Sequence, residues 1–333
     1  MKRRFERLVT LAVASLFISS VLSKALIDQI RFNDARASGG TQYSEVEVVA
    51  EMPNVTWTSE SIEWPLRRQD GTSVHFRLTS PRPHVWRLQS AGGNGRFENC
   101  GAAQLLKEEF GEPVDESSLP LAMSATSSSS FCIAPNQRGS YVELRTTPFT
   151  LSFFSSDEQV KVHITGISID ESAITVSGLL RPDERTFGLG ERFNGANQRG
   201  KAVRIWAEDR WLQTEGNSYV PIPFFLSTEG YGVFVNRHES SFFDLGKARK
   251  DAWSVTIEDA PLDLYVFTHD HPKDVLSALA ELTGFSPMPP EWAFGIFVSR
   301  HGGLREFATV EGVKEMVRKM DEHRLPWSAV ILD

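Results

Sequence analysis

The sequence predicts a mainly β N-terminal sandwich followed by the start of a (β/α)8 TIM barrel. Two observations predict the sandwich and a βαβ unit, and the barrel itself is implied by a family resemblance that later motifs carry. Short runs in which apolar and polar residues alternate, separated by turn residues, recur from Ser44 to Thr268 and are typical of antiparallel strands with one buried face. Residues 288–333 instead follow a strand–helix–strand pattern, which implies a parallel sheet. Only about forty residues follow Trp292, whereas a barrel needs roughly 200, so we expect a truncated chain with the first βαβ unit alone.

The composition is that of a globular protein and limits the classes of partner. The chain has 333 residues, enough for two domains, and 41% of them are hydrophobic and 23% charged. Its net charge of −8 argues against nucleic acid or an anionic membrane surface as a partner. The 22 Phe and eight Trp residues suit both large cores and sugar-stacking surfaces, so aromatic content decides neither.

The N-terminus has the layout of a signal peptide. Lys2–Arg4 precede an apolar run, Leu8–Leu22, and Ser23-Lys24-Ala25 fits a small-x-small cleavage site. The run is short for a bilayer span of about 20 residues. We therefore expect residues 1–25 to be removed and the protein to be secreted or periplasmic. An uncleaved leader is the alternative and would be the only membrane contact.

The sandwich domain is predicted over residues 44–270. The preceding segment, 26–43, is polar and is expected to be loose. Gln69–Thr72 is a turn signal between two strands. The run of serines within Leu119–Ser130 predicts a surface loop, after which strands are expected to resume.

Two motifs that suggest ligand binding have better structural explanations. Gly188-Leu189-Gly190 is not expected to bind phosphate, because Phe193 stands where a third glycine is needed and no helical pattern follows. His269-Asp270-His271 lacks a further metal ligand at suitable spacing and precedes Pro272, which favours the first position of a helix. We therefore expect a capped linking helix within 271–287, and no metal or cofactor.

Cys100 and Cys132 are the only cysteines of the chain. An oxidising compartment would allow them to pair, whereas two separate small core residues are an equally good interpretation. Their pairing therefore stays open. Neither has a nearby Cys or His with which to hold a metal ion.

The last stretch, 288–333, has polar residues where parallel sheets carry functional groups. Trp292–Val298 is a nearly continuous apolar run, predicted as a buried strand, and Ala329–Leu332 is a second, with an amphipathic helical pattern between them. Functional groups in such sheets gather at the carboxyl ends of the strands. The candidate site positions at these ends are Arg300, His301 and Asp333.

A long polar loop lies between two predicted strands of the sandwich. It contains Trp206, Asp209, Arg210 and Trp211. By composition alone, it is predicted to be a solvated excursion whose Trp residues pack back onto the sandwich.

Several motifs, in the same order, resemble glycoside hydrolase family 31, the family of α-glucosidases and α-xylosidases. The resemblance covers roughly Arg185–Asp333, and its motifs are GLGERF (188–193), QRG (198–200), the Trp206-x-x-Asp209 loop, YVPIPFFLS (219–227), GYGVFVN (230–236), LTG (282–284) and the barrel opening MPPEWAFGIFVSR (288–300) with LPWSAVILD (325–333). The part before Arg185 is compatible with the galactose-mutarotase-like sandwich of that family and has no sharp motif of its own.

Membership would imply an exo-acting retaining α-glycosidase that hydrolyses terminal α-linked glucose or a related sugar from oligosaccharides, and the signal-peptide layout adds that it is exported. The resemblance implies that Asp333 and Asp209 bind sugar hydroxyls, Asp209 from a sandwich loop at the barrel mouth, and that Trp206 sets this loop. Retaining enzymes need a nucleophile and an acid/base about 5 Å apart. The family carries both in motifs expected beyond Asp333, so no catalytic residue can be named and the fragment alone is predicted inactive. His301 stands where α-glucosidases commonly have an aromatic residue, which leaves α-xylose, α-galactose or modified sugars open.

Two other classes of function were considered. A non-catalytic carbohydrate-binding β-sandwich module, or a decayed remnant of an enzyme, is the alternative if the chain ends as given. A sugar epimerase would need a paired histidine and carboxylate on the sandwich face, and the histidines of this region show no evident pairing: His75, His84, His163 and His238. The sequence leaves open the linkage, hydrolysis versus transglycosylation, the oligomeric state and the host.

Overall fold

The computed structural model describes residues 55–68, 70–97, 118–127, 129–136, 139–208, 218–300 and 309–332, without the side chains of Arg300 and Leu332. The predicted signal peptide, the segment 26–43 and Cys100 lie outside these ranges. The chain divides into two compact units, Glu45–Phe285 and a second that includes Ser286–Asp333. Within the described residues no helix has the length and apolar character needed to cross a membrane.

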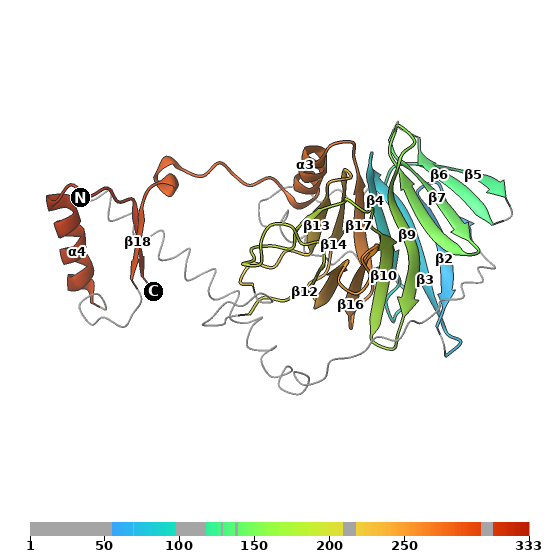
Figure 1. Ribbon diagram of the computed structural model, residues 1–333, viewed down its shortest axis with the longest axis horizontal. Coiled ribbons are helices and arrows are strands. Elements are labelled where there is room, and N and C mark those ends of the chain that lie inside the picture. Colours follow the sequence, from blue (N-terminus) through green and yellow to red (C-terminus); the bar gives the residue numbers. More distant parts are fainter. Residues whose placement is uncertain are drawn as a thin grey trace. The chain divides into compact units, whose positions relative to one another are not determined.

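The first unit is a sandwich of two antiparallel sheets (Figure 1). Within the described residues, the first sheet has eight strands, in the order β1 (Thr56–Trp57), β2 (Ser61–Arg67), β3 (Ser73–Arg82), β4 (Val85–Ser90), β17 (Asp263–Thr268), β14 (Tyr231–Val235), β13 (Phe224–Ser227) and β11 (Thr186–Gly188). The second sheet, counted over the same ranges, has nine: β12 (Lys201–Ile205), β15 (Ser241–Leu245), β16 (Ala252–Glu258), β10 (Ala173–Leu179), β9 (Val160–Ile169), β8 (Phe149–Phe154), β7 (Tyr141–Thr146), β6 (Ser130–Pro135) and β5 (Leu121–Ser127). The predicted sandwich is confirmed.

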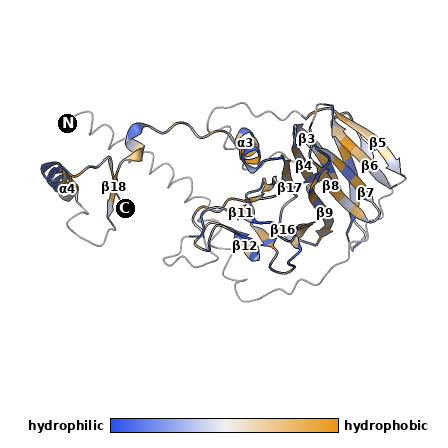
Figure 2. Ribbon diagram, turned by 45° about the horizontal axis from the view of Figure 1, so that its top comes forward, coloured by the Kyte–Doolittle hydropathy of each residue, from blue (hydrophilic) through white to orange (hydrophobic). Residues whose placement is uncertain are grey.

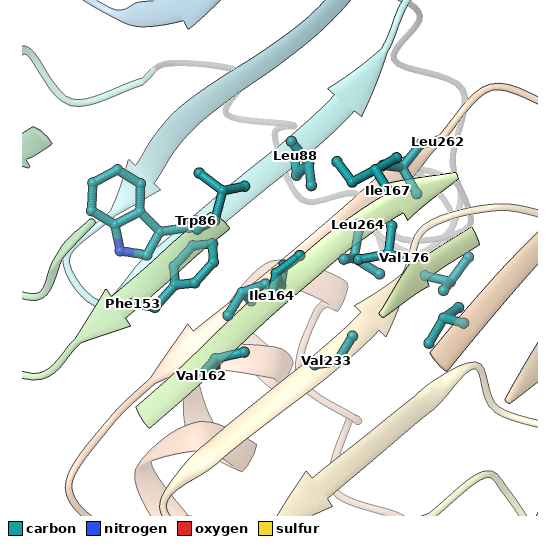
Figure 3. Close-up of a cluster of buried hydrophobic side chains, with 14 of the residues drawn as sticks. Trp86, Leu88, Phe153, Val162, Ile164, Ile167, Val176, Val233, Leu262 and Leu264 are labelled. Carbon is teal, nitrogen blue, oxygen red and sulfur yellow. The ribbon is translucent and has the colours of Figure 1, made fainter. Parts of the chain in front are cut away.

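The alternation in the sequence explains why the two sheets face each other. In β2, Ile62, Trp64 and Leu66 are buried while the residues between them are partly exposed, because successive side chains of a strand point to opposite faces. The same alternation is visible along the strands in Figure 2. Figure 3 shows the result: side chains of β4 and β17 meet those of β8, β9 and β10 between the sheets. Trp86 packs edge-on against Phe153 there, with ring centroids 6.3 Å apart.

Helix α3 (Pro272–Thr283) covers part of the other face of the first sheet. Its Val275 and Ala278 are buried in a second apolar cluster with strand residues that include Phe224 and Phe267. The predicted cap is confirmed, because the His271 side chain accepts a hydrogen bond from the backbone N–H of Lys273 and Pro272 opens the helix; Gly284 ends it at φ +93°. The helix predicted as a linking element therefore packs on the sandwich.

The loop predicted over Leu119–Ser130 is wrong. Most of this segment is strand β5, which pairs with β6 at the edge of the second sheet, with Met123 opposite Ile133. Side chains on β5 are largely exposed. Serine and threonine are compatible with such a position because the backbone makes the ladder and an exposed edge needs no apolar side chain. The polar composition of this segment predicts a loop, whereas its backbone forms an edge strand.

The second unit contains the predicted βαβ arrangement. Strand β18 (Phe297–Arg300) and strand β19 (Ala329–Leu332) pair in parallel, and helix α4 (Val310–Glu322) lies between them in sequence. The side chain of Thr309 caps α4 by accepting a hydrogen bond from the N–H of Gly312.

The strand predicted over Trp292–Val298 begins later than expected. Glu291–Phe294 forms a 3-10 helix, η1, which Gly295 closes by donating its N–H to the carbonyl of Trp292. The Trp292 ring stacks on Phe297, with centroids 6.1 Å apart. An apolar run alone does not distinguish one helical turn from a strand, and the turn occupies the first half of this run.

Candidate functional site

The residues that flank the segment 209–217 lie next to each other. Before it, β12 ends one sheet; after it, the chain runs towards β13 of the other sheet. Ala207 and Ser218 form an isolated parallel bridge, and the N–H of Glu208 donates to the carbonyl of Ser218 over 3.3 Å. The two described ends of this segment, which we call the loop roots (Trp206–Glu208 and Ser218), are therefore held together.

The GLGERF motif forms a turn that lies directly against the chain after the loop. Its first three residues, Gly188, Leu189 and Gly190, have φ of +115°, +65° and +85°, backbone conformations that residues with a side chain rarely adopt. A Cβ on Gly190 would lie 2.0 Å from the carbonyl oxygen of Val220, so only glycine fits. The backbone N–H of Glu191 donates to that same carbonyl over 3.0 Å. The glycines therefore allow the backbone of this turn to pack closely against the backbone at Val220.

Arg192 connects this turn to strand β12, close to its end. Its Nε donates to the carbonyl of Leu189 over 2.8 Å, and its Nη2 to the carbonyl of Arg204 over 3.3 Å. Burial lowers the pKa of the Arg192 guanidinium, although a group of this basicity stays charged at any physiological pH.

The QRG motif is a second structural anchor. The buried amide of Gln198 donates to the carbonyl of Gly195 over 2.7 Å. The Arg199 guanidinium donates to three carbonyls, those of Arg181, Glu184 and Lys250, over 2.7–2.8 Å. One side chain thus joins the strand connection before β11 to the turn before β16.

A buried carboxylate lies beside this anchor. Glu184 is 2% exposed and accepts hydrogen bonds from Ser227 Oγ over 2.6 Å, from the Tyr231 hydroxyl and from the backbone N–H of Arg181. Burial, and then the Glu184 charge, raise the pKa of Tyr231 well above its ordinary value. Tyr231 therefore acts as a permanent hydrogen-bond donor to Glu184.

Trp206 is the one predicted sugar-binding residue whose side chain the structure describes. It is half-buried at the first loop root, with the Arg204 guanidinium carbon 5.7 Å from its ring centroid. Arg204 is held in turn by Ser240 Oγ over 2.9 Å. The role of Trp206 in setting the loop stays a prediction. Asp209 lies outside the described residues, so its contact with sugar stays a prediction.

The other predicted site residues belong to the second unit. In the parallel pair, Arg300 of β18 stands opposite Leu332 of β19, and Asp333 follows Leu332 in sequence. The carboxyl ends of the two strands therefore meet at the same edge. His301, Asp333 and the side chain of Arg300 lie outside the described part, and their roles stay predictions.

Two histidine contacts were not anticipated. His163 Nδ1 lies 2.7 Å from Ser152 Oγ on β8, and burial, then Arg145, lower the pKa of His163. The rings of His84 and His269 lie 5.0 Å apart between a β-turn and the end of β17. Among the described residues, no three His, Cys, Asp or Glu side chains are arranged to hold a metal ion.

Cys132 lies on β6, and burial, then Glu143, raise the pKa of its thiol. Its pairing with Cys100 stays open because Cys100 is not among the described residues.

The whole of this anchoring region is matched by one family model. The model, described as the glycosyl hydrolase 31 N-terminal galactose mutarotase-like domain, matches residues 75–244, about half of the chain. The GLGERF turn, the QRG anchor and both loop roots lie within the match. The chain belongs to glycoside hydrolase family 31.

Relatives within the family differ in their named activities. The chain is 35% identical over 144 residues to the α-xylosidase XylQ of Lactiplantibacillus pentosus, a match that covers 43% of this chain and 18% of that protein. It is 31% identical over 155 residues to an isomaltosyltransferase of Sporosarcina globispora, covering 45% of this chain and 14% of that one. The matched part therefore spans less than a fifth of the length of these relatives.

Solved structures share the fold. A family 31 dextranase of Flavobacterium johnsoniae, in complex with isomaltotriose, superposes with a TM-score of 0.71 at 21% identity over 86% of this chain and 34% of that one. A family 31 α-xylosidase from a soil metagenome, in complex with xylose, gives a TM-score of 0.62 at 17% identity, over 83% and 41% of the two chains.

Proposed function

We propose that the chain is the N-terminal part of an exported retaining α-glycosidase that removes terminal α-linked glucose or a related sugar from oligosaccharides. The observation that carries the proposal is the family match over 75–244, which includes the loop with Asp209 and the roots that hold it. Proteins named α-xylosidase, α-glucosidase and isomaltosyltransferase match 43–45% of this chain at 29–35% identity. Export rests on the signal-peptide layout of residues 1–25.

The second unit is proposed to be the first βαβ unit of a (β/α)8 barrel. Parallel pairing of β18 and β19 supports this, as does the exposure of apolar side chains on the strands and helix: Phe297 is 41% exposed, Val310 64% and Ile331 48%. Further strands and helices of a barrel would cover such side chains.

The candidate residues of this chain would bind the sugar, and other residues would carry out the catalytic steps. Carboxylates such as Asp209 and Asp333 accept charge-assisted hydrogen bonds from two sugar hydroxyls each, which suits a neutral substrate. A retaining reaction needs one carboxylate as nucleophile and one as acid and then base, about 5 Å apart. We expect both beyond Asp333, so residues 1–333 alone should be inactive.

The proposal is tested with the complete gene product and a panel of aryl α-glycosides, the α-xyloside and α-glucoside first. Asp209→Ala should raise KM at least tenfold, because a charge-assisted hydrogen-bond pair contributes about 1.5–3 kcal/mol. Asp251→Ala is the matched control, since Asp251 is exposed and pairs only with Arg249 among the described residues. Absence of turnover on every α-glycoside, together with binding of α-linked oligosaccharides, would replace the enzyme with a carbohydrate-binding module.

A further inference from the structure

Two Asn-Gly pairs occur among the described residues, Asn94-Gly95 and Asn194-Gly195. Both glycines have a positive φ, +72° at Gly95 and +84° at Gly195. Because glycine has no side chain, its backbone nitrogen is less hindered than that of any other residue for attack on the amide of the preceding side chain. The local sequence therefore gives both asparagines the same chemistry, and their folded surroundings decide which of them reacts.

Asn94 lies in an exposed turn that follows β4. The N–H of Arg96 donates to the side-chain carbonyl oxygen of Asn94 over 2.9 Å, an Asx turn that folds the amide back over the peptide bond to Gly95. This hydrogen bond also draws electron density from Asn94 Cγ, which favours nucleophilic attack on that carbon.

The surroundings of this turn leave it open to water. Among the described residues, a Cβ built on Gly93 or on Gly95 would meet no atom within 4 Å. The N–H of Gly95 donates to the carbonyl of Gly92 over 2.9 Å within the same turn. A hydrogen bond in such an exposed place opens by local fluctuation, which frees the Gly95 nitrogen for reaction.

Asn194 has the same following residue and a different set of contacts. Its side-chain carbonyl oxygen accepts a hydrogen bond from Gln198 Nε2 over 3.1 Å. The same nitrogen donates to the carbonyl of Gly195 over 2.7 Å, and Lys201 Nζ donates to the carbonyl of Asn194. Gln198 is 2% exposed. Attack by the Gly195 nitrogen would require the Asn194 amide to turn away from this buried partner, so the reaction is opposed.

We infer that Asn94 is a site of spontaneous deamidation in the folded protein and that Asn194 is protected from the same reaction. The Gly95 nitrogen loses its proton to water or hydroxide, and its electron pair forms a bond to Asn94 Cγ. The bond from Cγ to the amide nitrogen breaks, and that nitrogen takes a proton from the solvent and leaves as ammonia. Water then adds to either carbonyl carbon of the cyclic imide and opens it to aspartate or isoaspartate at position 94.

The net reaction consumes one water, releases one ammonia and adds a negative charge to the protein at neutral pH. The new carboxylate would lie two residues before Arg96 and three before Phe97, whose ring centroid is 4.2 Å from the Arg77 guanidinium carbon. Isoaspartate also lengthens the main chain of the turn by one carbon. Because the turn is exposed, we expect the product to be a folded charge variant of the protein and its urea midpoint to stay unchanged.

The test incubates the complete protein at pH 8, folded and in guanidinium chloride, and needs no activity. Peptic digestion at low pH, where the attacking nitrogen keeps its proton, and mass spectrometry then give the loss of amide at each site. In the folded protein Asn194 should react at least about tenfold more slowly than Asn94, since two lost hydrogen bonds of typical strength change an equilibrium by that much. In guanidinium chloride the two should react at similar rates. Equal rates in the folded protein, or faster reaction of Asn194, would overturn the inference.

Variants test the protection separately. Gln198→Ala should speed the reaction of Asn194 about fivefold and leave that of Asn94 unchanged. Where this variant does not fold, Lys201→Met removes the ammonium that donates to the Asn194 carbonyl and should act in the same direction. Asn94→Gln is the matched control, because it keeps an amide, removes the reactive pair and leaves every contact of Asn194 in place. An unchanged rate at Asn194 in a folded Gln198→Ala or Lys201→Met protein would refute the protection.

Discussion

The two units of the chain differ in how far their large apolar side chains are buried. In the sandwich, large side chains such as Trp64, Trp86 and Trp253 are at most 1% exposed. In the second unit, Phe294 is 75% exposed and the described residues of helix α4 include none that is buried. Met316 and Met320 of α4 line an open hollow. The sandwich is thus packed by its own residues, whereas the βαβ unit presents apolar surface that its described residues do not cover.

This difference indicates which unit contributes most of the free energy of unfolding. Burial of a large apolar side chain contributes about 1.5–3 kcal/mol, so a tryptophan between the sheets and one in the βαβ unit should contribute very differently. Two elements of similar apolar composition can therefore differ in stability, because one is covered by its own domain and the other needs further parts of the protein to cover it. Four substitutions or conditions test this contrast, beginning with the largest effect.

The largest effect is expected from the same substitution made in both units. Trp86→Ala empties the space against Phe153 and leaves Ser140 Oγ without the indole N–H that it accepts over 2.7 Å, so unfolding should become easier by about 3–5 kcal/mol. Trp292→Ala should change the urea midpoint little. Trp86→Phe serves where the alanine variant does not fold. Equal losses at both positions would show that the second unit is packed as tightly as the sandwich.

A buried ion pair comes next. Arg87 and Asp263 are joined by two hydrogen bonds of 2.7 and 2.8 Å, and Asn236 donates to the same carboxylate over 2.9 Å. Asp263→Ala would leave the Arg87 charge largely buried, and we expect a loss of about 3 kcal/mol in the free energy of unfolding. In α4, Glu315→Ala removes an exposed partner of Arg318 and should not shift the unfolding curve measurably. A small loss at Asp263 would mean that water reaches the pair.

The sandwich was predictable because its alternation is a local signal. Ile62, Trp64 and Leu66 identify one face of β2 without any knowledge of its neighbours, and the same holds for the βαβ spacing. The edge strand β5 was missed because its side chains are polar on an exposed edge, so the signal that identifies a buried strand is absent. The run from Trp292 was misassigned in part because a single helical turn and a strand can share one apolar composition.

For the candidate site, Arg300, His301 and Asp333 are predicted from the carboxyl ends of two parallel strands, and Asp209 from family resemblance alone. Their contacts with sugar stay predictions, because their side chains lie outside the described part of the chain. The GLGERF motif was visible in the sequence, but the hydrogen bond that its Glu191 carbonyl accepts comes from Ser218, 27 residues away. No local signal in the sequence points to such a contact.

A smaller effect is expected at the buried carboxylate of the sandwich. Tyr231→Phe removes the hydroxyl that donates to Glu184, whose other partners are Ser227 and the N–H of Arg181. Because two donors remain, we expect a loss of about 1–2 kcal/mol and no change of fold. Circular dichroism and the urea midpoint together check both parts. A neutral result would show that water replaces the hydroxyl in a place that is 2% exposed.

The smallest effect is a pH dependence confined to the sandwich unit. Burial, and then His84, lower the pKa of His269, whereas Asp274, Asp270 and Glu281 act in the opposite direction. Arg82, which pairs with Glu281 over 2.9 Å, weakens the influence of that carboxylate. A histidine with a lowered pKa in the folded state resists protonation there. The stability that it contributes is therefore present above its ordinary pKa of about 6.5 and is lost as the pH falls below that value.

Wild-type protein should accordingly lose more stability between pH 7.5 and pH 5 than His269→Gln, which keeps a polar side chain of similar size. Hydrogen exchange locates the loss: amides of α3 should exchange faster at the lower pH once intrinsic rates are corrected for, because α3 begins three residues after His269 and carries two of the three carboxylates that act on its pKa. Amides of α4, whose His323 lies in the other unit, should show no such dependence. If α3 and α4 respond alike, the histidine pair does not distinguish the two units, and the pH effect belongs to the chain as a whole.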